Sequence, residues 1–235
     1  MKKLIFFVPV LLLSINSLAQ NISVKSSKSG RPDLPGTFLL ELGVNNPVNS
    51  SASFNTGFWG SRTVNLYYQY DIRILKSRFS LVPGIGLGMD RYKFTNNYTL
   101  DYESGTNAVI LTKSELSVKK SQLITNYLDV PVEVRYTSNP ENPNRSLKLA
   151  FGFRGGMLIS SFSKLKYTED SETIKLKTRR NWNLNKFRYG VYGKIGTGNF
   201  SVFGYYNLST LFKTGMGPDD YDINNVTFGI SLGGF

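Results

Sequence analysis

Hydrophobic and polar residues alternate with a period of two along much of this chain. The clearest case is "YLDVPVEVRY" at 127–136, in which every even-numbered position is Leu, Val or Tyr. The odd-numbered positions include Asp129, Pro131, Glu133 and Arg135. Because successive side chains of a β-strand point to opposite faces, this segment is predicted to be a strand with one apolar and one charged face.

The same alternation recurs in eight segments from residue 37 onward, most of them nine or more residues long. A tilted strand that crosses a bilayer needs about 9–11 residues, whereas strands of globular proteins usually have about 5–6. The lengths therefore favour strands that span a membrane. The segments are 37–45, 63–74, 79–92, 125–136, 146–159, 186–195, 200–212 and 226–235.

The connections between these segments alternate between long and short. The short ones are at 76–78, 137–145 and 196–199, and the long ones are at 46–61, 95–122, 163–182 and 213–225. Outer-membrane barrels have short periplasmic turns and longer outer loops. The sequence therefore predicts an all-β fold, an eight-stranded antiparallel up-and-down transmembrane β-barrel with both termini in the periplasm.

The start of the chain has the features of a secretory signal peptide. Lys2 and Lys3 precede an apolar run at 4–13, and "SLA" at 17–19 is a small-x-small cleavage box. The run is about ten residues long, and a transmembrane helix needs about twenty. We predict a signal peptide at 1–19, a polar periplasmic tail at 20–36 and the barrel at 37–235. The predicted location is the outer membrane of a Gram-negative bacterium.

Glycine is concentrated on the polar faces of the predicted strands, as at Gly84, Gly86, Gly88, Gly152 and Gly156. An eight-stranded barrel has a narrow interior in which small residues are useful. The apolar faces carry no charge over their central stretches. We therefore expect the polar face inside and the apolar face against lipid. The alternative is a soluble secreted ligand-binding barrel, with the two faces reversed.

The charged residues of the polar faces are then expected to point into the lumen. Four acids and five bases allow the charges to pair, and unpaired buried charges are costly. This predicts a lumen filled by side chains; the alternative is a narrow porin-like channel for ions or small solutes. The predicted lumen network is Glu41, Asp71, Arg73, Asp129, Glu133, Arg135, Arg154, Arg188 and Lys194.

Pro131 is an irregularity in this picture, because proline has no N–H group for the strand ladder and a closed barrel has no free edge. We predict either a β-bulge or a missing ladder hydrogen bond at this residue.

Several of these features resemble a known family. "YLDVPVEVRY" at 127–136, "GIGLG" at 84–88, the Ala19-Gln20 junction and the terminal Phe235 are similar to the Bacteroidetes outer-membrane β-barrel family that includes the PorT-like proteins. The resemblance covers most of residues 37–235. It implies an eight-stranded outer-membrane barrel and, through the PorT-like members, contact with envelope or secretion proteins of the type IX system.

Composition restricts the chemistry. The chain has no histidine and no cysteine, which excludes Ser-His-acid catalysis and Cys/His zinc sites. Asp129 and Glu133 share a face but lie about 13 Å apart along one strand, too far to cooperate directly. We expect no enzymatic activity, no metal and no cofactor. No nucleic-acid-binding pattern accompanies the net charge of +12, so nucleic acid is not an expected partner.

The positive charge favours anionic surfaces instead, and one predicted outer loop at 163–186 is strongly basic. It is either a solvated loop or a site for lipopolysaccharide or another polyanion. The sequence thus predicts a non-enzymatic barrel with a structural or partner-binding role among outer-membrane lipid and lipopolysaccharide. The basic residues of the loop are Lys164, Lys166, Lys175, Lys177, Arg179 and Arg180.

Overall fold

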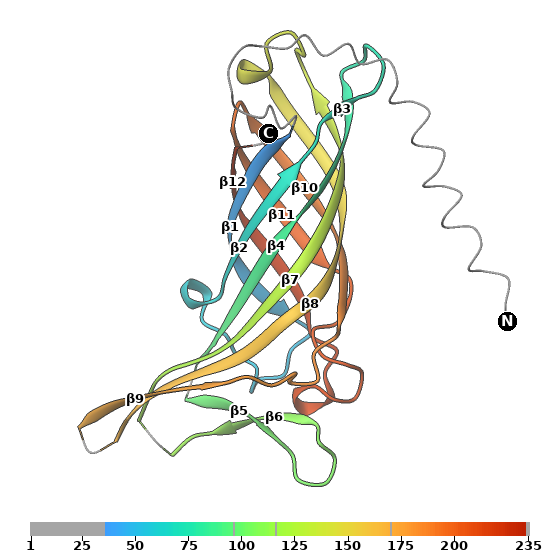
Figure 1. Ribbon diagram of the computed structural model, residues 1–235. Helices are drawn as coiled ribbons and strands as arrows, with labels where there is room; N and C mark the ends of the chain where they lie inside the picture. Colours follow the sequence, from blue (N-terminus) through green and yellow to red (C-terminus); the bar gives the residue numbers. More distant parts are fainter. Residues whose placement is uncertain (1–35, 96, 116, 170, 234–235) are drawn as a thin grey trace, which may run out of the picture. The chain divides into compact units, whose positions relative to one another are not determined.

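Antiparallel strands close into a barrel in the computed structural model of the chain (Figure 1). The structure describes residues 36–95, 97–115, 117–169 and 171–233. The predicted signal peptide at 1–19, the predicted tail up to residue 35 and the terminal Phe235 lie outside the described residues.

Eight strands form the barrel wall, each paired with its neighbour in the chain, so the predicted antiparallel up-and-down barrel is confirmed. Pairing of β12 with β1 closes the ring. Around the barrel the strands are β1 (Thr37–Val48), β2 (Arg62–Gln69), β4 (Phe79–Phe94), β7 (Ser117–Thr137), β8 (Leu147–Glu169), β10 (Phe187–Thr197), β11 (Phe200–Asn207) and β12 (Asn224–Leu232).

The remaining elements lie in the connections. Three short turns occupy one end of the barrel, where the two-residue β3 (Ile72–Arg73) pairs with β4. The 3-10 turns are η2 (Phe58–Gly60), η3 (Pro143–Arg145) and η4 (Pro218–Asp220). Among the described residues, no helix is long and apolar enough to cross a membrane.

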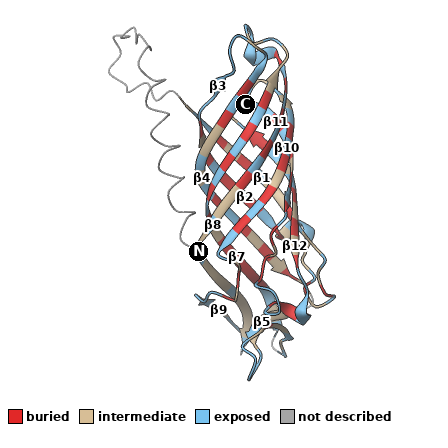
Figure 2. Cartoon of the chain, turned by 90° about the vertical axis from the view of Figure 1, so that its right-hand side faces the viewer, coloured by how far each residue is buried: buried red, intermediate tan, exposed pale blue. Residues whose placement is uncertain are grey.

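Burial alternates along each barrel strand, which Figure 2 shows as bands of red and pale blue. In β7, Asp129 and Glu133 are buried while Val130 and Val134 are exposed. The outward-facing side chains are apolar and suited to lipid. This distribution is the reverse of a soluble ligand-binding barrel, so that alternative is excluded.

Two of the predicted long loops contain regular structure. The connection expected at 95–122 holds the hairpin of β5 (Tyr98–Tyr102) and β6 (Val109–Lys113), followed by the first residues of β7. The connection expected at 163–182 is mostly strand, because β8 continues to Glu169 and pairs with β9 (Glu172–Thr178). Both arms of this second hairpin contain the sequence Lys-Leu-Lys, whose alternation continues the strand beyond the apolar belt.

The long connections also pack together into an apolar core, which we call the cap. Phe54 lies at its centre, with ring centroids 5.2 Å from Phe94 and 5.9 Å from Phe212. Tyr102 stacks on Trp182 at 5.3 Å. The buried residues of the cap are Phe54, Tyr92, Phe94, Val109, Leu123, Trp182, Leu184, Leu211, Phe212 and Ile223.

The strand ladder is interrupted at Pro131. The pairing of β4 with β7 runs from Phe79–Tyr136 to Pro83–Val132 and resumes at Gly86–Asp129 in the same register. There is thus no bulge at the proline, and the irregularity takes the form of lost pairing. Gly84 gives the ring room, because a Cβ atom there would lie 3.1 Å from Pro131 Cγ.

The cap should be stabilised by its apolar core, to which the ends of β4 and β7 contribute Tyr92, Phe94 and Leu123. Replacing Phe54 by Ala removes its central ring and is expected to destabilise the cap by about 3–5 kcal/mol. Limited proteolysis of the protein in detergent micelles should then cut the long connections faster, while the barrel strands stay protected.

The matched control is Phe58→Ala, since Phe58 is 59% exposed and outside the cap core. Equal cleavage of the two variants would contradict the assignment of Phe54 as the centre of the cap.

Candidate functional site

Inward-facing charged side chains meet in the middle of the barrel. Three strands separate β1 from β8 in either direction around the wall, so these two strands face each other across the lumen. Nη2 of Arg154 in β8 lies 2.7 Å from Oε2 of Glu41 in β1. This single ion pair therefore bridges the lumen, and its side chains fill the space between opposite walls.

A chain of ion pairs runs from this bridge toward the short-turn end. Lys194 Nζ lies 3.2 Å from Glu41 Oε1 and 3.0 Å from Glu133 Oε2. Arg135 pairs with Glu133 and places Nη1 3.3 Å from Asp71 Oδ2. The side chain of Asp71 is 46% exposed, so the chain of pairs ends at the rim of the barrel.

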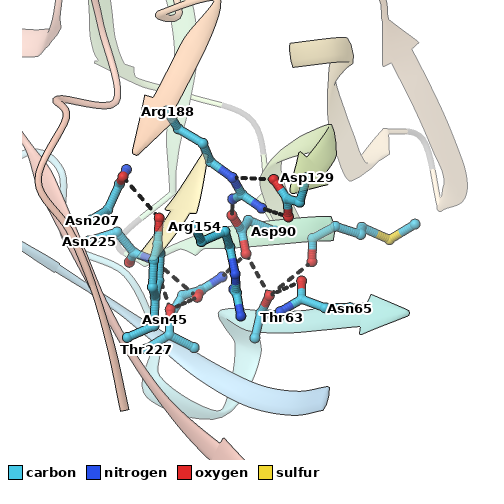
Figure 3. A network of polar contacts seen from close by, with 12 residues as sticks. Asn45, Thr63, Asn65, Asp90, Asp129, Arg154, Arg188, Asn207, Asn225 and Thr227 are labelled. Atoms are coloured by element: carbon cyan, nitrogen blue, oxygen red, sulfur yellow. Dashed lines mark hydrogen bonds and ion pairs between the residues drawn. The ribbon is translucent and has the colours of Figure 1, made fainter. Parts of the chain in front are cut away.

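A second cluster lies toward the cap (Figure 3). Arg188 pairs with both Asp90 and Asp129, and its Nε donates to Asp129 Oδ1 at 3.0 Å. The other oxygen of Asp90 accepts hydrogen bonds from Thr63 Oγ1 at 2.6 Å and from Asn45 Nδ2 at 3.2 Å. Both carboxylates are therefore saturated with donors, and one guanidinium holds them together.

Tyrosine side chains connect the two clusters. Tyr67 donates its hydroxyl hydrogen to Asp129 Oδ2 at 2.9 Å, and its ring centroid lies 4.9 Å from the Arg154 guanidinium carbon. The rings of Tyr192 and Tyr205 lie 5.2 Å and 4.6 Å from the same carbon. Arg154 thus sits inside a cage of three aromatic rings, a favourable setting for a desolvated cation.

Two glycines leave the space that the Arg188–Asp129 pair needs. A Cβ atom at Gly88 would contact Arg188 Nη2 and Asp129 Oδ2, and one at Gly156 would contact Asp129 Oδ1. Any other residue at either position would push the pair apart. The glycines on the polar faces therefore accommodate the lumen charges as well as the narrow bore.

The buried ion pairs contain equal numbers of acids and bases. Replacing one member of a buried pair leaves an uncompensated charge, which costs several kcal/mol. Within the described part of the chain, no three Asp, Glu, His or Cys side chains gather where they could hold a metal ion. Four buried carboxylates, Glu41, Asp90, Asp129 and Glu133, form ion pairs with four buried cations, Arg135, Arg154, Arg188 and Lys194. Lys148 is a further buried cation, and its Nζ donates to the carbonyl oxygen of Gly198 at 3.2 Å.

The structure brings together eight of the nine residues predicted for the lumen, and Arg73 is the exception. Arg73 is exposed, and its Nε donates to the carbonyl oxygen of Ser77 at 2.9 Å. The alternation in the sequence continues to residue 74, but β2 ends at Gln69 and both residues of β3 lie at the solvent-exposed rim. The prediction that Arg73 joins the lumen network is therefore wrong.

Asp90 is the main residue missing from the predicted network. It lies on the polar face of the segment at 79–92, so strict alternation would have included it. Tyr67 and Tyr192 lie on polar faces too, but their contacts with Arg154 depend on how strands far apart in sequence are staggered around the barrel.

The basic residues of the predicted outer loop form a second site, which we call the cationic arm. It comprises β9 and the part of β8 that pairs with it, and Figure 1 shows it extending away from the barrel. Lys164 is directly opposite Lys177, and Lys166 is opposite both Lys175 and Lys120 of β7. Partial burial, together with nearby cations, lowers the pKa of Lys120. Arg179 and Arg180 follow β9 and are exposed.

Comparison with known proteins agrees with this barrel. Residues 23–213 match the family described as "Outer membrane protein beta-barrel domain". The chain belongs to this family. As an outer-membrane barrel, the protein lies in the outer membrane of a Gram-negative bacterium, with its apolar belt in the lipid. The match is to the outer-membrane barrel domain in general, so the narrower Bacteroidetes and PorT-like resemblance stays a prediction.

Solved structures of two proteins resemble this outer-membrane barrel distantly. Ail, the attachment invasion locus protein of Yersinia pestis, is 13% identical with a TM-score of 0.35, covering 85% of this chain and 99% of that one. A second Ail structure, in complex with the heparin analogue sucrose octasulfate, is 14% identical with a TM-score of 0.34, at the same coverage. Neisserial surface protein A is 10% identical with a TM-score of 0.37, covering 86% and 97%. No curated protein sequence matches significantly.

Arg188 should be the most sensitive cation of the lumen, because it alone bridges Asp90 and Asp129. The variant Arg188→Leu leaves both carboxylates without their cation and is expected to lower the free energy of unfolding by about 3–5 kcal/mol. Urea unfolding of the barrel in lipid vesicles measures this difference.

Arg73→Leu removes the same type of side chain at the exposed rim and should change stability by less than about 0.5 kcal/mol. A similar loss of unfolding free energy in the two variants would show that the buried ion pairs of Arg188 contribute no more to stability than an exposed arginine.

Proposed function

We propose that this protein is a sealed, non-enzymatic barrel of the outer membrane whose outer end binds anionic partners in the envelope. The observation that carries the first part is the Arg154–Glu41 pair, which joins opposite walls of the barrel at 2.7 Å. An ion moving along the axis would have to separate this pair and its neighbour Lys194, leaving buried charges unpaired.

The cap supports the same proposal at the end of the barrel with long connections. Its aromatic core ties together segments from most of these connections, including Phe54, Trp182 and Phe212. A solute would therefore meet a packed apolar layer before it reached the charge network. The competing function is a narrow porin-like channel. Such a channel would require both the cap core and the Arg154–Glu41 ion pair to open.

The cationic arm supports the binding role. Like charges directly opposite each other on neighbouring strands repel, and Lys164–Lys177 and Lys166–Lys175 are two such pairs. An anionic partner would relieve this repulsion without any change in the fold. We place the arm, with the other long connections, on the outside of the cell, because short turns face the periplasm in outer-membrane barrels.

The proposal does not extend to protein secretion. The PorT-like resemblance implied such a role, but the family match concerns the barrel domain alone. A binding role on the cell surface needs only the arm and the barrel that anchors it.

Planar bilayer recordings test the sealed lumen. The purified protein, inserted into a bilayer, is expected to give no steady single-channel current, and Arg188→Leu should insert but give flickering currents because its lumen packing is loosened. A steady open-state current from the wild-type protein would contradict the proposal and favour the porin-like channel.

Binding of soluble polyphosphate tests the arm. Removing four of its charges should weaken binding at least tenfold, and added salt should weaken the wild-type binding, since exposed charges are screened. Removing four exposed charges at the short-turn end is the matched control and should have little effect; an equal loss in both variants would indicate only a response to net charge. The arm variant is Lys164→Gln/Lys166→Gln/Lys175→Gln/Lys177→Gln, and the control is Arg73→Gln/Lys76→Gln/Arg78→Gln/Arg145→Gln.

A further inference from the structure

A groove lies on the outer surface where β8 changes partner. Its pairing with β10 ends at Met157–Phe187, and its pairing with β9 begins at Ser163–Thr178. Between these points, a hydrogen bond of 2.7 Å from Leu158 N to the Lys186 carbonyl oxygen is the last main-chain bond before the strands part. The opening that results has a volume of about 570 Å³.

The floor of this groove is apolar and belongs to the lipid-facing surface. Met157, Ile159 and Phe187 line it, with Ile159 55% and Phe187 67% exposed. Ile159 has no partner in β7, because the register shifts between Leu158 and Ser160. Ile159 lies two residues after the outward-facing Met157 in β8, and its side chain is likewise exposed on the outer surface.

The groove lies at the outer edge of the apolar belt. Leu147, at the short-turn end of β8, and Ile159 are separated by twelve residues. At about 3.3 Å per residue and a tilt of about 45°, this separation spans about 28 Å along the barrel axis. The apolar band of an outer-membrane barrel is about 25 Å tall, so Ile159 lies where acyl chains meet headgroups.

The rim of the groove is cationic. Arg179, Arg180 and Lys186 are exposed and line it, and none of them forms a salt bridge with another described residue. Arg180 is held in place, since its carbonyl oxygen accepts a hydrogen bond from Ser161 Oγ at 2.7 Å and its guanidinium lies 5.6 Å from the Tyr102 ring. Three positive charges therefore surround an apolar floor.

We propose that this groove binds a phosphorylated lipid of the outer leaflet. Guanidinium groups match phosphate geometry with paired hydrogen bonds, so Arg179 and Arg180 would hold the phosphate. An acyl chain would lie along Met157, Ile159 and Phe187. A free phosphate would use the rim alone, and a polysaccharide would leave the apolar floor uncovered; a phosphorylated lipid satisfies both parts of the groove.

The cationic arm extends this site. The side chains of Lys164 and Lys177 lie on the same face as Phe162, with Nζ atoms 5.4 Å and 4.3 Å from its ring centroid. Phe162 and Lys164 are two residues apart in β8 and share a face, and Arg179 follows Lys177 by two residues, just beyond the end of β9. A second phosphate on the same headgroup would fall within reach of these lysines. The inference rests on the proposed membrane orientation and not on the sealed lumen.

Binding of diphosphorylated lipid A to the purified full-length barrel in detergent micelles tests the proposal. The rim variant Arg179→Gln/Arg180→Gln/Lys186→Gln is expected to bind the lipid at least tenfold more weakly than the wild type. Arg73→Gln/Lys76→Gln/Arg78→Gln removes three exposed charges at the opposite end and should leave binding unchanged. Retained binding by the rim variant, or an equal loss in the control, would overturn the proposal.

Two further measurements separate the parts of the groove. Ile159→Ser/Phe187→Ser should weaken lipid binding, whereas Phe228→Ser, at an exposed site on β12, should not. Inorganic pyrophosphate should displace the lipid only at a large excess; displacement at equal concentration would show that the rim alone binds and would overturn the assignment of a lipid. Heat-modifiable migration in gels verifies that every variant is folded. Bilayer conductance of the same preparations tests the sealed lumen separately, so either proposal can fail without the other.

Discussion

The structure depends on one constraint: a charged side chain inside a narrow barrel must meet an opposite charge from another strand. Arg154 reaches Glu41 across the lumen, and Arg188 of β10 pairs with Asp90 of β4 and Asp129 of β7, two strands on the other side of β8. Leaving any of these charges unpaired would cost several kcal/mol, against a total stability of about 5–15 kcal/mol for a typical protein. The inward glycines and the tyrosine cage around Arg154 both serve this pairing.

The sequence was sufficient to predict which side chains point inward wherever that depends only on the alternation within one strand. Alternation was sufficient to place Asp129, Glu133 and Arg135 inside, because the two faces of a strand follow from its period. Alternation did not predict where strands end or which residues of different strands come into contact. Arg73 continues an alternating pattern past the end of β2, and the cap joins Phe54 to Phe212, residues whose contact depends on three-dimensional packing. The partner of each lumen charge could not be predicted either, because it depends on the stagger of strands around the ring.

Because ion-paired side chains occupy the barrel interior, the proposed binding role falls to the outer surface. Each of the buried lumen carboxylates Glu41, Asp90, Asp129 and Glu133 is ion-paired, whereas the cationic arm and the rim of the groove expose cations beside an apolar belt. These two surfaces are joined through β8, the longest strand, which crosses the membrane with its first half and builds the arm with its second. One strand therefore links the paired charges inside to the proposed binding surface outside.

The most direct measurement is a double-mutant cycle on Glu41 and Arg154, with Glu41→Gln, Arg154→Met and the combined variant unfolded by urea in lipid vesicles. If the two side chains are paired across the lumen, the cycle should give a coupling free energy of about 1–3 kcal/mol. A coupling below about 0.5 kcal/mol, the value expected of independent sites, would show that the charges do not hold opposite walls together and would contradict the account.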